Sequence, residues 1–228
     1  MNTKNEARKS LLFVVDDHPI MRDGISQLIN QQADLEVCGT ASSGPEALEA
    51  LNRMDPDLLL VDISLKGMDG IELIKIVKKR KKRMPMLVLS MHAEALYAER
   101  AIRAGAKGYV MKHASTDTLL AAIRKILAGK IYLSPAMTEK ILEKVNRDDL
   151  ARNESPVACL SDRELEIFKL IGQGLRPHGI AEELHLSVKT VETYYSRIKQ
   201  KLNIKDASEL LQMAIAWRAD LEEPETLT

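Results

Sequence analysis

Five short runs of apolar residues divide the first half of the chain, and their starts lie 20 to 30 residues apart. The runs are rich in leucine and β-branched residues and alternate little with polar ones, which is typical of parallel strands buried on both faces. Segments with helical spacing lie between them. This alternation predicts an α/β fold with a doubly wound, five-stranded parallel sheet over residues 10–130. The runs are LLFVV at 11–15, LEVCGTA at 35–41, DLLLVDI at 57–63, MLVLS at 86–90 and GYVMK at 108–112.

The pattern changes after Gly129, and beyond Leu160 only helical spacing is found. Ser161 and Glu164 have the spacing of a capping box, which predicts the start of a helix. Further on, a short helix, a tight turn and a longer helix capped by Ser187 match the geometry of a helix-turn-helix. The expected organisation is a first domain at 10–130, a linker at 131–158 with an amphipathic helix at 135–146, an all-α domain of four helices at 159–220 and an acidic tail at 221–228.

Composition excludes several classes of protein. Lys and Arg total 33 and Asp and Glu total 33, so the net charge favours neither nucleic acid nor a membrane surface. The two cysteines, Cys38 and Cys159, are too far apart for a disulfide framework or a zinc site, and they fit a reducing compartment. No apolar run reaches the roughly 18–20 residues of a membrane span, and the polar N-terminus is unlike a signal peptide. Secreted and integral membrane proteins are therefore set aside.

Polar side chains stand where the apolar runs end. Asp16 and Asp17 follow the first run, Asp62 ends the third, Ser90 the fourth and Lys112 the fifth. Because the carboxyl ends of neighbouring parallel strands meet at one edge of a sheet, we expect one crevice to hold all five. Each residue alone is explained by an exposed strand end, but five of them in this order favour a site.

The chemistry of this set is that of phosphoryl transfer. Three adjacent carboxylates repel one another and need a cation, and an all-oxygen site suits Mg²⁺. With the metal and Lys112 beside it, Asp62 stays ionised and can attack phosphorus as a nucleophile. The two cations then neutralise the charge of the transferring group. The hydroxyl of Ser90 can donate a hydrogen bond to a phosphoryl oxygen.

The segments FVVDDH, LLLVDISLKGMDG, VLSMH and GYVMK resemble the receiver domain of response regulators, over residues 11 to 130. The resemblance implies that a sensor histidine kinase phosphorylates Asp62. One departure is Lys66, which stands where many receivers have proline. The other implied roles are metal binding by Asp16, Asp17, Asp62 and the backbone carbonyl of Ser64, and switching by Ser90, Tyr109 and Lys112.

Several charged or titratable residues near these motifs are given a structural interpretation. His18 is interpreted as a helix-start residue before Pro19, and His92 and His113 flank the site without a catalytic role. Six consecutive cations occupy 78–83. They could form a nucleic-acid patch or a nuclear signal, but a solvated helix end is favoured, because cations are stabilising at a helix C-terminus.

The longer helix of the second domain carries a local positive charge. Residues 187–205 contain five cations and a single carboxylate, giving +4. The surrounding stretch, LSDRELEIFKLIGQGL to IAEELHLSVKTVETYYSRIKQKL, resembles the LuxR-type helix-turn-helix of the NarL/FixJ class of two-component response regulators. In that arrangement the longer helix enters the major groove, where basic residues hold phosphates and polar ones meet base edges. The candidate DNA-contacting residues are Lys189, Thr190, Glu192, Thr193, Tyr194, Ser196, Arg197 and Lys201.

Departures from this class gather at the reading surface. Glu192 stands where many members have lysine, Tyr194 where histidine is common, and residues 176–179 replace a Ser- or Thr-capped helix start. The sequence preference for DNA is therefore expected to be unusual. In this class the last helix forms a two-fold dimer, and Leu210, Leu211 and Ile215 are the candidate dimerisation residues.

The resulting hypothesis is a transcription factor, not an enzyme, that a sensor histidine kinase phosphorylates on Asp62, after which it dimerises and binds promoter DNA. The resemblance also implies Mg²⁺ as cofactor, RNA polymerase as a further partner, no membrane, and a bacterial cytoplasmic location. Two alternatives stay open: a phosphorylation-independent regulator whose receiver is a dimer module, and a Mg²⁺-dependent aspartyl-phosphate phosphatase. The kinase, the stimulus, the operator, the sign of regulation and the resting domain arrangement are not predicted.

Overall fold

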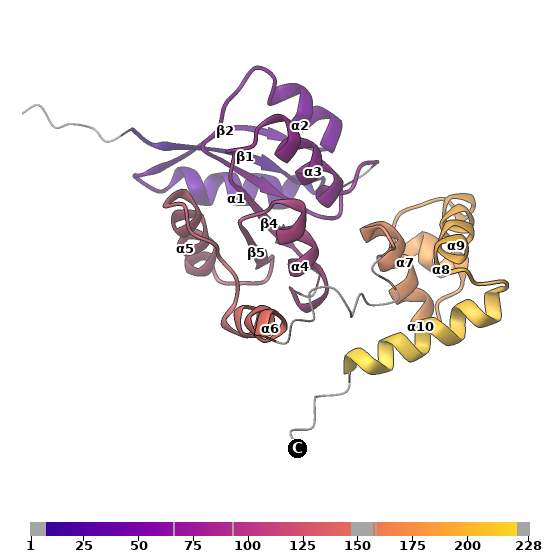
Figure 1. Ribbon diagram of the computed structural model, residues 1–228. Helices are drawn as coiled ribbons and strands as arrows, with labels where there is room; N and C mark the ends of the chain where they lie inside the picture. Colours follow the sequence, from indigo (N-terminus) through magenta and orange to yellow (C-terminus); the bar gives the residue numbers. More distant parts are fainter. Residues whose placement is uncertain (1–7, 66, 93, 147–156, 158, 223–228) are drawn as a thin grey trace, which may run out of the picture. The chain divides into compact units, whose positions relative to one another are not determined.

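The computed structural model describes residues 8–65, 67–92, 94–146, 157 and 159–222 (Figure 1). The chain forms two compact units, Met1–Asp149 and Leu150–Thr228. Each is described by itself. Some predicted features lie outside the described residues: Lys66, residues 147–156 and 158 of the linker, and the tail beyond Glu222.

The first unit is a parallel sheet of five strands in the order β2-β1-β3-β4-β5. This confirms the predicted fold class. The strand order places β1 next to β3, so the ends of both strands are adjacent and the chain reverses its winding direction between them. The strands are β1 (Ser10–Val15), β2 (Leu35–Ala41), β3 (Leu58–Val61), β4 (Met86–Ser90) and β5 (Gly108–Met111).

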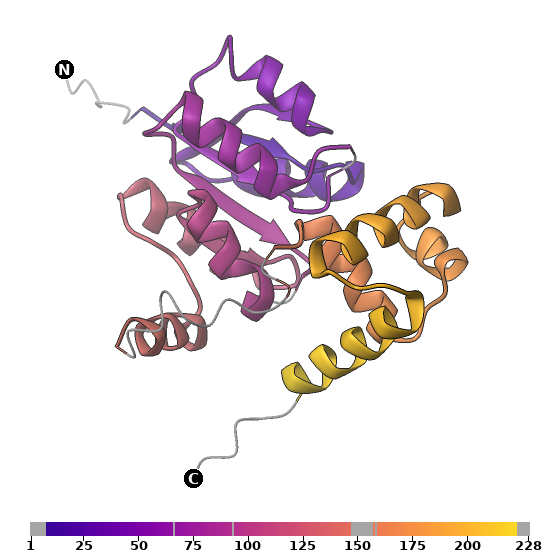
Figure 2. The same ribbon diagram turned by 45° about the vertical axis from the view of Figure 1, so that its right-hand side comes forward.

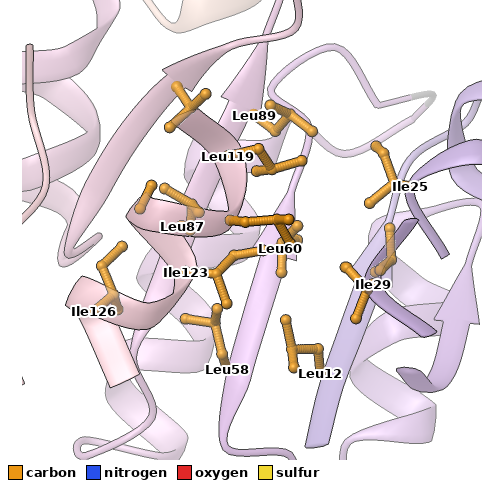
Figure 3. Close-up of a cluster of buried hydrophobic side chains, with 14 of the residues drawn as sticks. Leu12, Ile25, Ile29, Leu58, Leu60, Leu87, Leu89, Leu119, Ile123 and Ile126 are labelled. Carbon is orange, nitrogen blue, oxygen red and sulfur yellow. The ribbon is translucent and has the colours of Figure 1, made fainter. Parts of the chain in front are cut away.

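Helices cover both faces of this sheet (Figure 1, Figure 2). On one face, α1 and α5 pack against every second residue of the strands. The strand residues between them point to the opposite face of the sheet. Figure 3 shows this core, in which Leu12, Leu58 and Leu60 of the strands meet Ile29 of α1 and Ile123 of α5. The helices of this unit are α1 (Pro19–Asn30), α2 (Gly44–Ala50), α3 (Gly70–Arg80), α4 (Glu94–Ala104), α5 (Thr116–Leu127) and α6 (Pro135–Asn146).

The chain that leaves α5 continues along the sheet edge. Tyr132 forms an isolated parallel bridge with Gly108, and its carbonyl accepts a 3.1 Å hydrogen bond from the backbone N–H of Tyr109. The backbone N–H of Ser134 then donates to the Glu94 carboxylate at 3.0 Å. Helix α6 follows, with the bounds at which the sequence predicts an amphipathic helix, and its Met137 is buried. We call residues 131–134 the edge strap.

The second unit contains the four predicted helices, α7 (Asp162–Gly172), α8 (Pro177–Glu183), α9 (Val188–Leu202) and α10 (Ala207–Glu222). Both side-chain caps predicted from the sequence are present, a capping box at Ser161 and a hydrogen bond to Ser187 from the backbone N–H of Thr190. Helix α10 ends at Glu222, two residues beyond the expected end of this domain at residue 220. The first proline after the start of this helix is Pro224. A proline disfavours helical backbone angles at the residue before it, so the helix is expected to end close to this point.

In the part of the chain that the structure describes, no helix is both long enough and apolar enough to cross a bilayer.

Candidate functional site

Three charged side chains meet at the carboxyl edge of the sheet. The Lys112 Nζ atom lies 2.7 Å from an oxygen of Asp16 and 2.7 Å from an oxygen of Asp62. Both carboxylates are only 2% exposed. They meet because β1, β3 and β5 all end at this edge, and each residue follows its strand directly. Asp17 borders the same pocket, and together these residues form what we call the acidic pocket.

Burial and neighbouring charge act in opposite directions in the acidic pocket. Burial raises the pKa of Asp62 above its usual value, and the nearby Lys112 ammonium offsets this only in part. Burial opposes the charge of Lys112, but the carboxylates of Asp62 and Asp16 outweigh burial and raise the pKa of the lysine. Three carboxylates and one ammonium leave an excess of negative charge, which fits a divalent cation.

His18 contacts this pocket in addition to starting a helix. It stands at the N-cap of α1, as expected, without a capping bond from its side chain. Its ring Nδ1 lies 2.8 Å from Asp17 and 3.3 Å from Asp16, and its backbone N–H donates to Asp16 at 2.9 Å. Ligand atoms of His18 and of Asp16, Asp17 and Asp62 all lie within 4.8 Å of one another. The only sequence signal for this contact is adjacency to the acidic pair.

The three carboxylates supply the oxygen atoms that Mg²⁺ prefers. Ser64 follows Asp62 by two residues, and its backbone N–H donates to an Asp62 oxygen at 3.3 Å, so this loop is folded around the carboxylate. The residues present therefore fit a magnesium ion held by oxygen atoms.

A second set of contacts joins the neighbouring strand ends. Ser90 is fully buried, and its Oγ accepts a 3.1 Å hydrogen bond from the backbone N–H of His92. Tyr109 is buried, and its hydroxyl donates to the His92 carbonyl at 2.7 Å. The His92 ring lies 2.8 Å from the Ser64 hydroxyl and stacks on Tyr97 with centroids 4.6 Å apart. His92 thus links the loops after β3 and β4 to Tyr109 of β5, a role that its place in the sequence does not indicate.

The loop that carries Asp62 is held by a close approach of backbone to backbone. The N–H of Gly70 donates to the Ile63 carbonyl at 2.9 Å, and Asp69 caps α3 by accepting from two backbone N–H groups. A Cβ at Gly70 would overlap the Asp62 carbonyl oxygen and lie 2.8 Å from the Cα of Ile63. Only glycine fits this position without moving the loop.

Helix α9 presents a polar face on the second unit. Its buried side is formed by Val191 and Ile198, as the spacing predicts. Of the eight candidate DNA-contacting residues, six are exposed, and Thr190 and Tyr194 are half-buried. The Arg197 guanidinium lies over the Tyr194 ring, 5.9 Å from its centroid. The exposed side chains of the set are Lys189, Glu192, Thr193, Ser196, Arg197 and Lys201.

Comparison with known proteins shows which family this chain belongs to. Residues 12–124 match the model of the response regulator receiver domain, and residues 158–214 match that of the bacterial regulatory proteins of the luxR family. The oxygen regulatory protein NreC of Staphylococcus carnosus is 37% identical over 208 residues, covering 90% of this chain and 96% of that protein. The chain belongs to the LuxR-type response regulators. It is a DNA-binding response regulator of a two-component system.

Solved structures of other response regulators agree with this assignment. A LuxR-family response regulator from Aurantimonas is 33% identical, with a TM-score of 0.56, over 60% of this chain and 97% of that one. RcsB of Salmonella enterica serovar Typhimurium, solved on promoter DNA with the phosphomimetic BeF3−, is 26% identical with a TM-score of 0.56. That match covers 90% of this chain and 97% of the RcsB chain.

Lys201, one of the candidate DNA-contacting residues of this response regulator, forms an ion pair within its own domain. The Lys201 Nζ atom lies 2.6 Å from Glu164, whose side chain is 4% exposed. Glu164 also accepts the capping-box bond from the Ser161 N–H at 2.7 Å. The ion pair fastens α9 to the start of α7, so the Lys201 ammonium is already engaged. Its distance from Glu164 depends on how the two helices pack, which no local motif encodes.

The Glu164–Lys201 pair should make the second unit of the response regulator sensitive to acid. Burial raises the pKa of Glu164, but the bonds from Lys201 and Ser161 outweigh burial and lower the net pKa. A lowered folded pKa gives stability that is present above the unfolded value of about 4.3 and is lost as the pH falls through the folded value. At pH 7, Glu164→Gln should lose about 2 kcal/mol of unfolding free energy.

Urea unfolding, followed by fluorescence of the single tryptophan, measures this difference. Trp217 contacts Phe168 within the second unit, with ring centroids 5.6 Å apart, so it reports on this unit. The difference between wild type and Glu164→Gln should shrink between pH 5 and pH 3. Glu183→Gln, an exposed carboxylate of α8, is the control. A difference that persists unchanged at pH 3 contradicts the electrostatic account.

The candidate dimerisation residues of the response regulator separate into two groups. Leu210 is completely buried within its own unit, so its side chain packs the domain core. Leu211 and Ile215 are 39% and 50% exposed. Leu210 is therefore not part of the surface that a second copy can reach, because its side of α10 faces α7. Among the side chains of α10 that the structure describes, Leu211 and Ile215 are the large apolar ones that are exposed.

Proposed function

We propose that this response regulator is switched by phosphorylation of Asp62 by a sensor histidine kinase, and that its phosphorylated form dimerises and binds promoter DNA. The observation that carries the proposal is the acidic pocket, where Asp62 and Asp16 share one ammonium at 2.7 Å. Because Lys112 is bonded to the Asp62 carboxylate, its ammonium lies beside any phosphoryl group that forms on this residue. The bacterial relatives support a location in the bacterial cytoplasm, and contact with RNA polymerase is part of the same proposal.

The proposed transfer uses side chains that the structure already positions. An Asp62 oxygen attacks the phosphorus of a phosphohistidine; the new P–O bond forms as the P–N bond breaks, and the imidazole takes up a proton. Asp16, Asp17, Asp62 and the Ser64 carbonyl would hold Mg²⁺, which would supply positive charge to the transferring group when bound. Lys112 supplies a second positive charge and keeps the Asp62 carboxylate oriented.

After transfer, the phosphoryl oxygens are new acceptors at the pocket. Lys112 can exchange its bond to Asp62 for one to a phosphoryl oxygen, and the Ser90 hydroxyl can donate to another. The Ser90 oxygen also accepts from His92, whose carbonyl accepts from Tyr109. A shift of Ser90 therefore reaches Tyr109 through two hydrogen bonds. The backbone of Tyr109 is bonded to the edge strap, which leads to α6.

The proposed DNA contacts lie on α9, whose exposed side has a net positive charge. RcsB, solved as dimers bound to DNA, supports this role by similarity. Lys189 and Arg197 are placed to contact phosphates, whereas Glu192 is exposed at a position where it can accept from a cytosine amino group. Leu211 and Ile215 are the proposed dimer contacts.

Lys189→Ala should weaken DNA binding about equally on all sequences, because the ammonium of Lys189 is exposed and contacts phosphate in this proposal. Each phosphate contact contributes about 0.9 to the slope of log K against log salt concentration, so the slope should fall by about this amount. Fluorescence anisotropy from 50 to 200 mM salt measures it. Lys75→Ala, an exposed lysine of α3, should leave the slope unchanged. A normal slope for Lys189→Ala means that this residue contacts no phosphate.

The whole proposal is tested with the full-length protein, Mg²⁺ and a small phosphoryl donor. Light scattering should show a shift from monomer to dimer after the donor is added, and binding to genomic DNA fragments should become tighter and map the operator. If mass and DNA affinity are the same with and without the donor, phosphorylation does not control this protein, and the receiver then serves another input.

A further inference from the structure

A second charged site lies at the amino-terminal edge of the sheet. There a cavity of about 790 Å³ opens between the start of β1, the segment from α3 to β4, and the start of β5. Its polar lining is dominated by cations. They are Arg8, Lys9, Lys81, Lys82, Arg83 and Lys107. We call this feature the basic cavity, and we propose that it binds a nucleoside polyphosphate.

The carboxylates of the cavity are already engaged. Asp57 accepts a 2.8 Å hydrogen bond from the backbone N–H of Leu11 and lies 3.9 Å from Arg8. Asp55 pairs with Lys81 at 2.9 Å. Among the described residues, Lys82, Arg83 and Lys107 have no carboxylate within ion-pair distance. Three cations from two segments thus line one cavity without a carboxylate partner in the described part of the chain, and an anion bound there is attracted to all of them.

The dipole of α3 accounts for only part of the basic run. Lys78, Lys79 and Arg80 lie in the last turn of this helix, where cations stabilise the C-terminus. Lys82 and Arg83 come after the helix end, and Lys107 arrives from a different part of the chain, before β5. A solvated helix end therefore explains the first half of the run. The second half, together with Lys107, lines a cavity.

The shape and chemistry of the cavity indicate the class of ligand. Its volume falls within the roughly 300–1,000 Å³ of small-molecule sites. Arginine and lysine recognise phosphate oxygens, and three cations suit a chain of phosphates. The floor includes Pro56, Met84 and Ile126, which are buried apolar residues. An apolar surface beside a row of cations fits a planar base joined to several phosphates.

The basic cavity is separate from the acidic pocket. Pro85 lines the cavity immediately before β4, and Ser90 ends the same strand at the acidic pocket. A five-residue strand spans about 16 Å, so one small ligand does not occupy both. The proposed binding is independent of the phosphorylation of Asp62.

Isothermal titration calorimetry on the full-length protein tests the proposal, with ATP and sodium triphosphate as probes in EDTA and 150 mM salt. The cavity variant is Lys82→Gln/Arg83→Gln/Lys107→Gln. Its matched control, Lys75→Gln/Lys79→Gln/Arg80→Gln, removes three exposed cations of α3 that do not line the cavity. Far-UV circular dichroism establishes that both variants are folded.

We expect ATP to bind wild type, the control and Asp62→Asn alike, and to bind the cavity variant at least tenfold more weakly. Weaker binding of triphosphate than of ATP supports a contact with the base. The proposal is overturned if neither probe binds, if the cavity variant binds ATP normally, or if the control loses as much affinity as the cavity variant. A further result would also overturn it: wild type binds neither probe and the cavity variant loses DNA affinity. The cations of the cavity would then contact DNA phosphates instead of a nucleotide.

Discussion

Asp62→Asn should abolish covalent phosphorylation and leave the receiver folded. Asparagine has the shape of aspartate but is not a nucleophile for phosphorus. Lys112 keeps its 2.7 Å partner Asp16, so the buried ammonium is not left alone. With a small phosphoryl donor and Mg²⁺, intact-protein mass spectrometry should show one added phosphoryl group on wild type and none on the variant. The donor-dependent gain in DNA affinity should disappear as well.

Asp55→Asn is the matched control for this substitution. It removes a carboxylate at the opposite edge of the same sheet, at a side chain that is 87% exposed. It should incorporate phosphate as wild type does. Phosphate on the Asp62→Asn variant would place the acceptor elsewhere, and a full DNA response without phosphate would sink the proposed switch even if Asp62 is the acceptor.

Gly70→Ala should be the most damaging single-methyl change in the receiver. The added Cβ would overlap the Asp62 carbonyl oxygen and crowd the Ile63 backbone, and neither atom belongs to a flexible side chain. We expect a loss of about 3 kcal/mol or more of unfolding free energy, at or beyond the upper end for overpacking. Because the strain falls on the Asp62 loop, phosphate incorporation should slow as well. Thermal unfolding by circular dichroism and the mass assay measure the two effects.

Gly24→Ala is the opposite case on the same unit. Gly24 lies within α1, and a Cβ there meets no atom within 4 Å. Alanine is favoured over glycine inside a helix by up to about 1 kcal/mol, so this variant should be as stable as wild type or more so. Equal melting temperatures for Gly70→Ala and Gly24→Ala would refute the close-contact argument.

The sequence predicts the elements well because burial on both faces leaves an unbroken apolar run. The five strands, the caps at Ser161 and Ser187 and the buried side of α9 follow from such local patterns. The strand-end residues of the acidic pocket also follow, since parallel strands bring their ends together. The assigned roles of these residues remain proposals that the variants above test.

Features that depend on how separate elements meet could not be predicted. The contacts of His92 join loops that follow different strands. The ion pair of Lys201 forms only because α7 and α9 pack so that Glu164 lies beside the lysine. The predicted dimer contacts include Leu210 together with Leu211 and Ile215, and the packed structure shows that Leu210 faces inward while the other two stay exposed. The six cations at 78–83 read as one run, although the fold divides them between a helix end and a cavity.

The edge strap has a practical consequence for dissecting this protein. Tyr132 pairs with the β5 backbone, and Met137 is buried beyond it, so the packing of the receiver does not stop at residue 130. A fragment cut at Gly129 exposes the Tyr109 N–H on an open strand edge, and open edges template the pairing of one molecule with another. Fragments intended for study in isolation, or for grafting onto a different output domain, should therefore keep the chain through Asn146.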